Sequence, residues 1–448
     1  MKHTLFTLLA ICTMAGLSAQ EDAPLKFSLQ EAVTYALEHN YSAINADRDI
    51  LDAQKQKWET IASGLPQISG AINYQNQLIQ QVVQLPGPIA GGDPGTFVEV
   101  VFGQPQQINA SATLRQQIFD GSYIVGVQAT KAFLSYSANN KEKTEQEVRK
   151  AVVEAYGNVL LARESVSIFE KNKATLDKNL FETQKLFENG LGDEESVEQL
   201  QITLASVENQ LKNAIRLRDI TLQMLNLVMG LALEAPTQLT QDLDDLTQQQ
   251  IDFSLMDDAL VLEDNVDYKL AMNLNEQRYY EWKLARSRAL PTLNGFFSYG
   301  ALSFADQFTF LDSGQPYFEF STFGLDLNIP IFSSLGRSAS TQRAKIALEK
   351  AKTQLTEAEA QIRLQLENAR SNYTLAIEQY ATSKSNLGLA ERIERKNQVK
   401  YEEGIASSFE LRQAQTQLYN AQQEYLQSMI EVINKKTALE IILNDNSL

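Results

Sequence analysis

The chain has 448 residues, of which 44% are hydrophobic, and its formal net charge at pH 7 is −17. This hydrophobic content is typical of a folded protein and exceeds that of intrinsically disordered chains. The excess of 56 acidic over 39 basic residues argues against nucleic-acid binding, which requires a basic face. The chain contains one cysteine, Cys12, and two histidines, His3 and His39. Because these are too few for a Cys/His zinc site, a disulfide or a Cys–His catalytic pair, we predict no cofactor, no metal and no enzyme activity.

The first segment, residues 1–19, has the pattern of a secretory signal peptide. A basic start at Lys2 is followed by an apolar run of about ten residues and by small residues ending at Ala19. The alternative is a lipoprotein signal acylated at Cys12, which the bulky Ile11 before the cysteine disfavours. The rest of the sequence has no apolar run of about 18 residues that would form a transmembrane helix. We therefore expect a mature chain that is exported from the cytoplasm.

Two copies of one plan account for the remaining residues. Each copy is predicted to hold short helices, a pair of strands, one long helix and one returning helix. In the first copy, 20–233, the strand pair covers about 66–118, the long helix about 121–189 and the returning helix about 194–230. In the second copy, 254–448, the corresponding segments are about 291–330, 336–403 and 407–442. Residues 234–253 are predicted to be a linker between the copies.

The duplication is clearest in the two long helices. Their core positions are spaced by four and three residues, which is a heptad repeat, and the second run follows the first by 214 residues. The two runs are Val148, Val152, Ala155, Val159, Ala162, Val166 and Phe169, and then Ile362, Leu366, Ala369, Tyr373, Ala376, Tyr380 and Ser383. A helix of about 67 residues is on the order of 100 Å long. Gly190 and Gly404 lie where each chain segment must turn back, so we predict two long antiparallel helical hairpins.

Alternating residues ahead of each long helix predict β-strands with one apolar and one polar face. The apolar faces are Ile68, Gly70, Ile72 and Tyr74, then Ile108, Ala110, Ala112 and Leu114, then Leu293, Gly295, Phe297 and Tyr299, and finally Phe323, Leu325, Leu327 and Ile329. The connection 77–106 is rich in glycine and proline and is predicted to be a long hairpin loop. Capping boxes beginning at Ser28 and Ser254 are expected to start the short helices.

Four amphipathic strands in an exported chain suit a membrane β-barrel, yet such a barrel needs at least about eight strands. The chain must therefore form an oligomer to close a barrel, and three copies would supply twelve strands. The long helices, with the short ones stacked end to end, would then continue the barrel as a helical tube. The alternative is a soluble four-stranded sheet that covers a core.

The order of these features resembles the TolC family of outer-membrane efflux channels over nearly all of the mature chain. The residues that carry the resemblance are Leu65-Pro66 and Leu290-Pro291, Ile118-Phe119-Asp120-Gly121 and Pro330-Ile331-Phe332, and the turns at Gly190-Leu191 and Gly404-Ile405. The resemblance implies a mainly α-helical homotrimer, with a 12-stranded outer-membrane β-barrel continued by a 12-helix periplasmic α-barrel. It also implies a passive duct that docks onto a periplasmic adaptor (membrane fusion) protein and serves an inner-membrane transporter of the RND or ABC type.

Two candidate sites follow from the resemblance. The periplasmic tip that contacts the adaptor corresponds here to Gly190, Leu191, Gly192, Gly404, Ile405, Ala406 and Ser407. The pore constriction at that tip corresponds to Glu410 and Glu198. Three symmetric carboxylates near a pore axis would attract cations and repel anions. The alternative for Glu410 is an ordinary first-turn acid favoured by the helix dipole.

The leading hypothesis is therefore the exit duct of a tripartite efflux pump in the outer membrane of a Gram-negative bacterium. The duct would extend into the periplasm, contact outer-membrane lipid and bind no nucleic acid. A type I protein secretion duct of the same fold is one alternative. A coiled-coil structural or adhesive envelope protein is another, although the duplicated strands disfavour it. A secreted hydrolase is disfavoured because the sequence has no Gly-x-Ser-x-Gly motif.

Overall fold

The computed structural model describes residues 25–89 and 91–444, which form two compact units. The helical unit contains the described residues up to Arg48, Asn139–Lys269 and those from Ala358 onward. The sheet unit contains Asp49–Ala138 and Leu270–Glu357. Each unit takes segments from both sequence copies, so the copies at 20–233 and 254–448 are not separate compact domains. The expected signal peptide at 1–19, with Cys12, lies outside the described residues.

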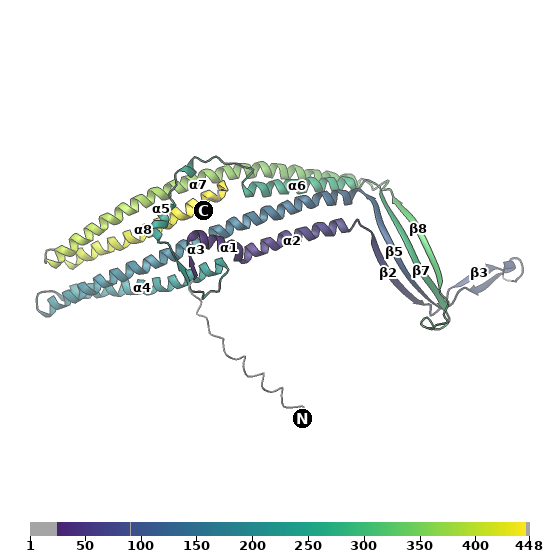
Figure 1. Ribbon diagram of the computed structural model, residues 1–448, viewed down its shortest axis with the longest axis horizontal. Helices are drawn as coiled ribbons and strands as arrows, with labels where there is room; N and C mark the ends of the chain where they lie inside the picture. Colours follow the sequence, from purple (N-terminus) through teal and green to yellow (C-terminus); the bar gives the residue numbers. More distant parts are fainter. Residues whose placement is uncertain (1–24, 90, 445–448) are drawn as a thin grey trace, which may run out of the picture. The chain divides into compact units, whose positions relative to one another are not determined.

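Helices make up most of the described chain (Figure 1). The α-helices are α1 (Leu29–His39), α2 (Tyr41–Ala62), α3 (Gly121–Glu188), α4 (Glu194–Met229), α5 (Leu243–Gln249), α6 (Val266–Ser287), α7 (Gly336–Glu402) and α8 (Ser408–Leu443), with short 3-10 helices η1 (Gly87–Ile89) and η2 (Ser254–Met256). The strands are β1 (Leu25–Phe27), β2 (Gln67–Asn76), β3 (Val82–Pro86), β4 (Phe97–Val101), β5 (Gln106–Asp120), β6 (Thr237–Leu239), β7 (Thr292–Ala305) and β8 (Phe318–Asn328). The long helices expected from the heptads are α3 and α7, and the returning helices are α4 and α8.

The main sheet of the sheet unit has the strand order β2-β5-β7-β8, and all its neighbours are antiparallel. The register places the alternating apolar residues of neighbouring strands opposite one another, as in the row Ile68, Leu114, Phe297 and Phe323. Directly paired residues share a face, so the sheet has one largely apolar face. Ile68 is 78% exposed and Phe323 is 73% exposed, so this apolar face is uncovered in the single chain.

The opposite face of β7 and β8 carries two phenyl rings that lie over glycines. Phe296 is paired with Gly324, and Phe320 is paired with Gly300. A Cβ at Gly324 would lie 2.4 Å from the Phe296 ring, and one at Gly300 would lie 2.6 Å from the carbonyl oxygen of Ala110. Glycine at these positions therefore makes the space that the rings and the neighbouring backbone occupy.

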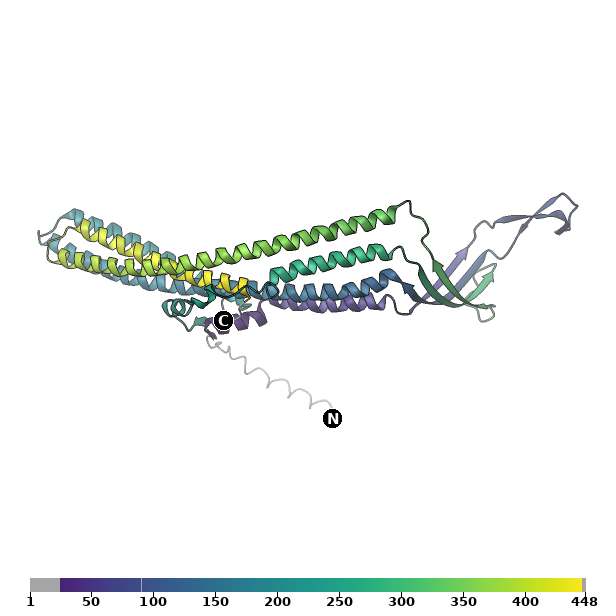
Figure 2. The same ribbon diagram turned by 90° about the horizontal axis from the view of Figure 1, so that it is seen from above.

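The helices of the sheet unit stand in the same order as its strands (Figure 2). Tyr123 on α3 donates a hydrogen bond to a carbonyl of α2 at 3.0 Å, and Ser287 on α6 donates to Ser122 on α3 at 3.3 Å. Thr341 on α7 donates to the carbonyl of Ala285 on α6 at 3.4 Å. Since each helix is joined to one strand by a short connection, the helix order α2-α3-α6-α7 repeats the strand order β2-β5-β7-β8.

The core of the helical unit lies along the heptad positions of α3 and α7. All fourteen positions of the two predicted runs, Val148 to Phe169 and Ile362 to Ser383, are buried. One hydrophobic cluster joins α1, α3, α4, α7 and α8, and a second joins α3 to α4 further along. Among the described residues, no helix is both long enough and apolar enough to cross a membrane.

The segment 234–253, predicted to link the two copies, contains the strand β6 and the helix α5. Its strand β6 pairs in parallel with β1, and its helix α5 buries Leu243 and Leu246. The buried Tyr373 hydroxyl donates to the carbonyl of Gln250 at 2.7 Å and accepts from the N–H of Asp252 at 2.9 Å.

Two asparagines with the same role join the starts of α2 and α6 to the ends of the returning helices α4 and α8. Asn40 accepts from the N–H of Ser42 at 2.7 Å, as the N-cap of α2, and donates to the carbonyl of Val228 in α4 at 2.6 Å. Asn265 accepts from Tyr268 at 3.1 Å, as the N-cap of α6, and donates to the carbonyl of Ile442 in α8 at 2.9 Å. At both joints, one asparagine therefore links the start of one helix to the end of a returning helix by hydrogen bonds.

Only one of the two expected capping boxes forms. The box of Ser28 and Glu31 is complete at the start of α1. The box expected at Ser254 is wrong, because η2 there has no side-chain cap and the next α-helix starts at Val266. Asp252 accepts hydrogen bonds from both the backbone N–H and the hydroxyl of Ser254, which engages that hydroxyl in a local turn.

Candidate functional site

Both helical hairpins of the helical unit turn through the same hydrogen-bonded motif. Gly190 and Gly404 have φ of 75° and 72°, the left-handed conformation that glycine adopts with little strain. In each turn two backbone N–H groups donate to the last turn of the long helix over 2.7 to 3.0 Å: Gly190 to Phe187, Leu191 to Leu186, Gly404 to Tyr401 and Ile405 to Lys400. These are Schellman C-caps, so both turns are defined by backbone hydrogen bonds.

Each turn presents one aliphatic side chain to solvent at the equivalent position. Leu191 is 77% exposed and Ile405 is 74% exposed. In many Schellman motifs this side chain packs back on the helix, whereas here both remain uncovered. The next residue, Gly192, lies close to the end of α3, since a Cβ there would lie 3.2 Å from the backbone nitrogen of Phe187. Ala406, after Ile405, is half-buried.

The two returning helices start with different caps. Asp193 caps α4 by accepting from the N–H of Ser196 at 2.7 Å, and hydrogen bonds from Ser196 lower the pKa of the Asp193 carboxyl. Ser407 caps α8 in a capping box, in which Glu410 accepts from the N–H of Ser407 at 2.8 Å. That backbone hydrogen bond, followed by one from the Ser407 hydroxyl, lowers the pKa of the Glu410 carboxyl. The first-turn role that we considered for Glu410 is therefore present in the structure.

The two acids assigned to a pore constriction lie on different helices. Glu198 is exposed near the start of α4, and Glu410 is exposed in the first turn of α8. Their helices meet nearby, because Ser196 on α4 donates to Ser408 on α8 at 2.9 Å. The common location of the two acids at the hairpin ends follows from this contact, and their role in a pore stays a prediction.

Polar contacts join the two hairpins near their turns. The amides of Asn179 and Gln398 exchange hydrogen bonds of 2.9 and 2.8 Å between α3 and α7. Thr183 and Tyr401 pair at 2.7 Å, and Asn172 donates to Gln422 on α8 at 3.0 Å. These contacts were not predicted from the sequence, although Asn172 and Asn179 lie seven residues apart on α3 and so share a helix face. By contrast, α3 and α4 pack through aliphatic and aromatic residues, among them Phe169, Leu176 and Leu200.

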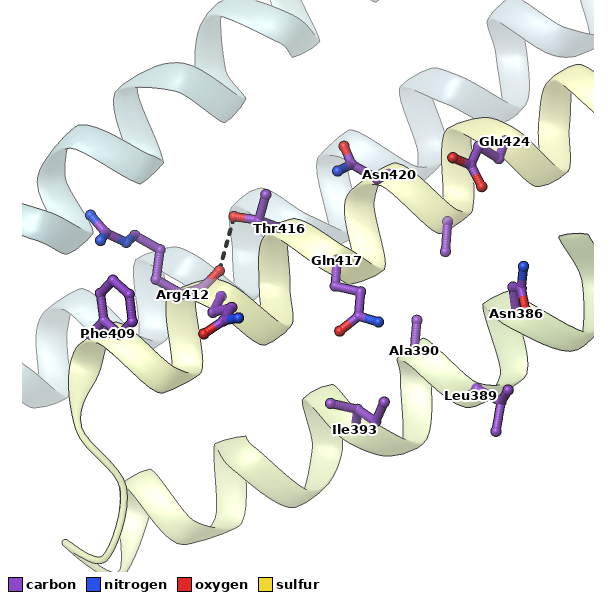
Figure 3. A pocket seen from close by; sticks show the side chains of 12 residues that line it. Asn386, Leu389, Ala390, Ile393, Phe409, Arg412, Thr416, Gln417, Asn420 and Glu424 are labelled. Carbon is purple, nitrogen blue, oxygen red and sulfur yellow. Dashed lines mark hydrogen bonds between the residues drawn. The ribbon is translucent and has the colours of Figure 1, made fainter.

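A groove of about 890 Å³ runs between α7 and α8 (Figure 3). Asn386, Leu389 and Ile393 line it from α7, and Gln417 and Glu424 line it from α8. Within the described part of the chain, no group of three His, Cys, Asp or Glu side chains is placed to hold a metal ion. The groove mixes aliphatic and amide side chains, a surface suited to packing against another helix more than to chemistry on a small molecule.

The fold is that of outer-membrane channel proteins. Three solved structures with high similarity are the outer membrane protein VceC from Vibrio cholerae, the CmeC outer membrane channel from Campylobacter jejuni and the open state of the MtrE outer membrane channel from Neisseria gonorrhoeae. Each matches with a TM-score of 0.70 and covers 93% of this chain, and the match spans 95%, 85% and 88% of the respective relative. Identities are 16%, 17% and 17%, so the likeness shows the fold alone.

The chain belongs to the outer membrane efflux protein family, whose sequence profile matches residues 62–231 and 263–445. It is accordingly an outer-membrane protein of a family of efflux channels. A comparison with curated protein sequences gives no significant match. The resemblance to the TolC family that the sequence indicated is confirmed by the family match and by the shared fold.

Proposed function

We propose that three copies of this chain form an outer-membrane channel that is the passive exit duct of a tripartite efflux pump. The observation that carries the proposal is the open four-stranded sheet, which has an uncovered apolar face and two unpaired edge strands, β2 and β8, in the described chain. An apolar outer face suits contact with lipid, and backbone groups at a sheet edge must be paired within a membrane. The second face of the sheet would line the pore.

The number of strands supports an oligomer. Four strands do not close a barrel, and pairing β8 of one copy with β2 of the next would remove every free edge. Three copies would give twelve strands. Because the helices of the sheet unit follow the strand order, closing the sheet would also place the helices of the three copies in a ring.

The turns of the two hairpins support docking onto a periplasmic adaptor that belongs to an inner-membrane transporter. Leu191 and Ile405 are exposed aliphatic side chains on turns that backbone hydrogen bonds define. An apolar residue that is held in place loses little conformational entropy when a partner covers it. Gly190, Gly192, Gly404, Ala406 and Ser407 would shape these turns and allow the partner to approach closely.

The pore constriction is proposed at Glu410 and Glu198, near the same turns. Three copies would bring three carboxylates of each kind toward the channel axis, where they would favour cations. The capping box holds the Glu410 carboxylate in one orientation, so that its charge would have a fixed position in the ring.

Planar-bilayer conductance of the purified protein tests the channel. We expect cation-selective conductance from a species that migrates as a trimer in outer-membrane extracts. Glu410→Ala should raise the open probability and lower the cation preference. Glu403→Ala, which changes an exposed acid of the neighbouring turn, is the matched control and should change neither. A soluble monomer, or a trimer without conductance, would contradict the proposal.

A pull-down with the periplasmic adaptor tests the docking. Leu191→Asp and Ile405→Asp should each weaken capture about ten-fold or more, since each places a charge in an apolar contact. The trimer should remain intact, because both side chains are exposed. Unchanged capture by both variants would remove these turns from the adaptor site.

A further inference from the structure

The connection 77–106, expected to be a loop, contains a separate β-hairpin. Strands β3 and β4 pair from Val82 with Val101 to Pro86 with Phe97. Its turn is tightly built, because Gly87 donates to the carbonyl of Thr96 at 2.7 Å and a Cβ at Gly87 would lie 2.5 Å from the carbonyl oxygen of Asp93. Figure 1 shows β3 projecting away from the ends of β2 and β5. The hairpin is a folded element of the sheet unit and belongs to neither candidate site described above.

This hairpin lacks a polar face. One face carries only aliphatic residues: Val83, Leu85, Val98 and Val100. On the other face, Gln84 and Glu99 form one polar pair between Val82, Val101 and Phe97. Phe97 is 67% exposed. Since an isolated two-stranded hairpin is only marginally stable in water, a surface this apolar indicates a partner that covers it.

The edge of β4 is the less protected of the two edges of this hairpin. Within the described chain, β3 and β4 pair only with each other, so each has one unpaired edge. Pro86 lacks an N–H and blocks one end of the β3 edge. Phe97–Val101 contains no proline and no lysine, the two residues that most often protect an edge strand. An added strand would therefore pair with β4.

The charges of the hairpin favour a basic segment as the occupant. No Lys or Arg occurs between Lys57 and Arg115, and the charged residues of the hairpin are Asp93 and Glu99. A second copy of β4 would bring Glu99 close to another Glu99, and like charges on neighbouring strands are destabilising. An anionic lipid headgroup layer would repel the same residues. A strand that carries a basic residue complements Glu99.

We propose that the edge of β4 binds an extended segment of a partner protein by β-strand addition, with a Lys or Arg of that segment beside Glu99. Main-chain hydrogen bonds would supply the affinity, and the apolar neighbours Val98 and Val100 would contact alternate apolar side chains of the segment. The hairpin lies at the end of the sheet away from the connections to α2, α3, α6 and α7. Its location at the cell surface rests on the proposed function.

The first test measures binding of two labelled synthetic peptides, Thr-Val-Lys-Val-Thr and Thr-Val-Glu-Val-Thr, to the purified full-length channel. The Lys peptide should bind about 3- to 30-fold more tightly than the Glu peptide, as expected for opposite against like charges on neighbouring strands. Glu99→Lys should reverse the preference. Asp312→Lys, which changes an exposed acid of the β7–β8 loop, is the control and should preserve the preference. Equal binding of both peptides, or no binding, would overturn the proposal.

The second test identifies the occupant in cells that produce the protein. A photo-crosslinking p-benzoyl-phenylalanine at Phe97 should give an adduct with a different polypeptide, and Glu99→Lys should reduce its yield by the factor seen with the peptides. The same probe at Phe308, which is 58% exposed on the β7–β8 loop, should give no such adduct. Adducts only with a second copy or with lipid would overturn the proposal. A conducting trimer that fails both tests would refute only this inference, whereas loss of the trimer itself would refute the proposed function.

Discussion

Replacing Asn40 by alanine should loosen one joint between stacked helices. The Asn40 side chain caps α2 through Ser42 and donates to the carbonyl of Val228 at the end of α4. Alanine removes both hydrogen bonds and leaves a donor of α2 and a carbonyl of α4 without these partners. The two helix ends should then open more often, while the heptad core of α3 stays intact.

The size of the effect follows from the two hydrogen bonds. Loss of an N-cap costs about 1 kcal/mol. Loss of the amide hydrogen bond to the Val228 carbonyl costs about another 1 kcal/mol. A total of about 2 kcal/mol corresponds to about 30-fold more frequent local opening. Asn40→Ser keeps an acceptor for the cap but loses the amide donor, so it should make local opening only about 5-fold more frequent.

Hydrogen exchange followed by mass spectrometry measures this opening in the assembled protein. Peptides that cover the first turn of α2 and the last turn of α4 should exchange faster in Asn40→Ala, and peptides from the middle of α3 should not. Asn45→Ala, at an exposed position one turn further along α2, is the matched control. Asn265→Ala should have the same effect where α6 meets α8. Wild-type exchange at both ends of the Asn40→Ala joint would refute the reasoning.

Three other predictions concern the turns and the sheet. Because the pKa of Glu410 is lowered, its capping box stabilises α8 at pH values above the ordinary carboxyl pKa of 4.5, and this stabilisation is lost as pH falls through the lowered pKa. Ser407→Ala should remove this pH dependence. The measurement is amide exchange in the first turn of α8, corrected for intrinsic rates. Gly300→Ala should reduce the yield of assembled trimer on gels, because overpacking against backbone costs about 1–3 kcal/mol. Gly324→Ala, which meets a movable ring, should reduce it less; equal yields would contradict the distinction. Leu191→Ala should leave the amide exchange of its turn unchanged, since the Schellman hydrogen bonds use only backbone atoms; faster exchange would show that the side chain supports the turn.

The elements with a strong period were predictable from the sequence. The heptads of α3 and α7 were identified because a buried seam on a helix requires apolar residues at spacings of three and four. The strands β2, β5, β7 and β8 alternate because their two faces have different surroundings. The turns at Gly190 and Gly404 were located because a reversal needs a left-handed residue, and glycine adopts it with little strain.

Elements without a period were missed or predicted wrongly. The sequence predicts a long hairpin loop at 77–106, where the structure has the hairpin of β3 and β4, because these strands have apolar residues on both faces and glycine and proline between them. The helix start expected at Ser254 was wrong because Asp252 engages that serine locally. The contacts of Asn179 with Gln398 join residues 219 positions apart, so no local pattern reveals them.

The low cysteine and histidine content, the duplication and the two periods are properties of the sequence by itself, because each depends on residue identity and local spacing. They determined the class of protein, the four strands of the main sheet and the places where the two long hairpins turn. The tertiary structure decided what each side chain at those places does. It showed Glu410 in a capping box, Asn40 and Asn265 joining helices end to end, and the linker packed against the core. The reason is physical: these roles depend on hydrogen bonds between segments that are distant in the chain and meet only after folding.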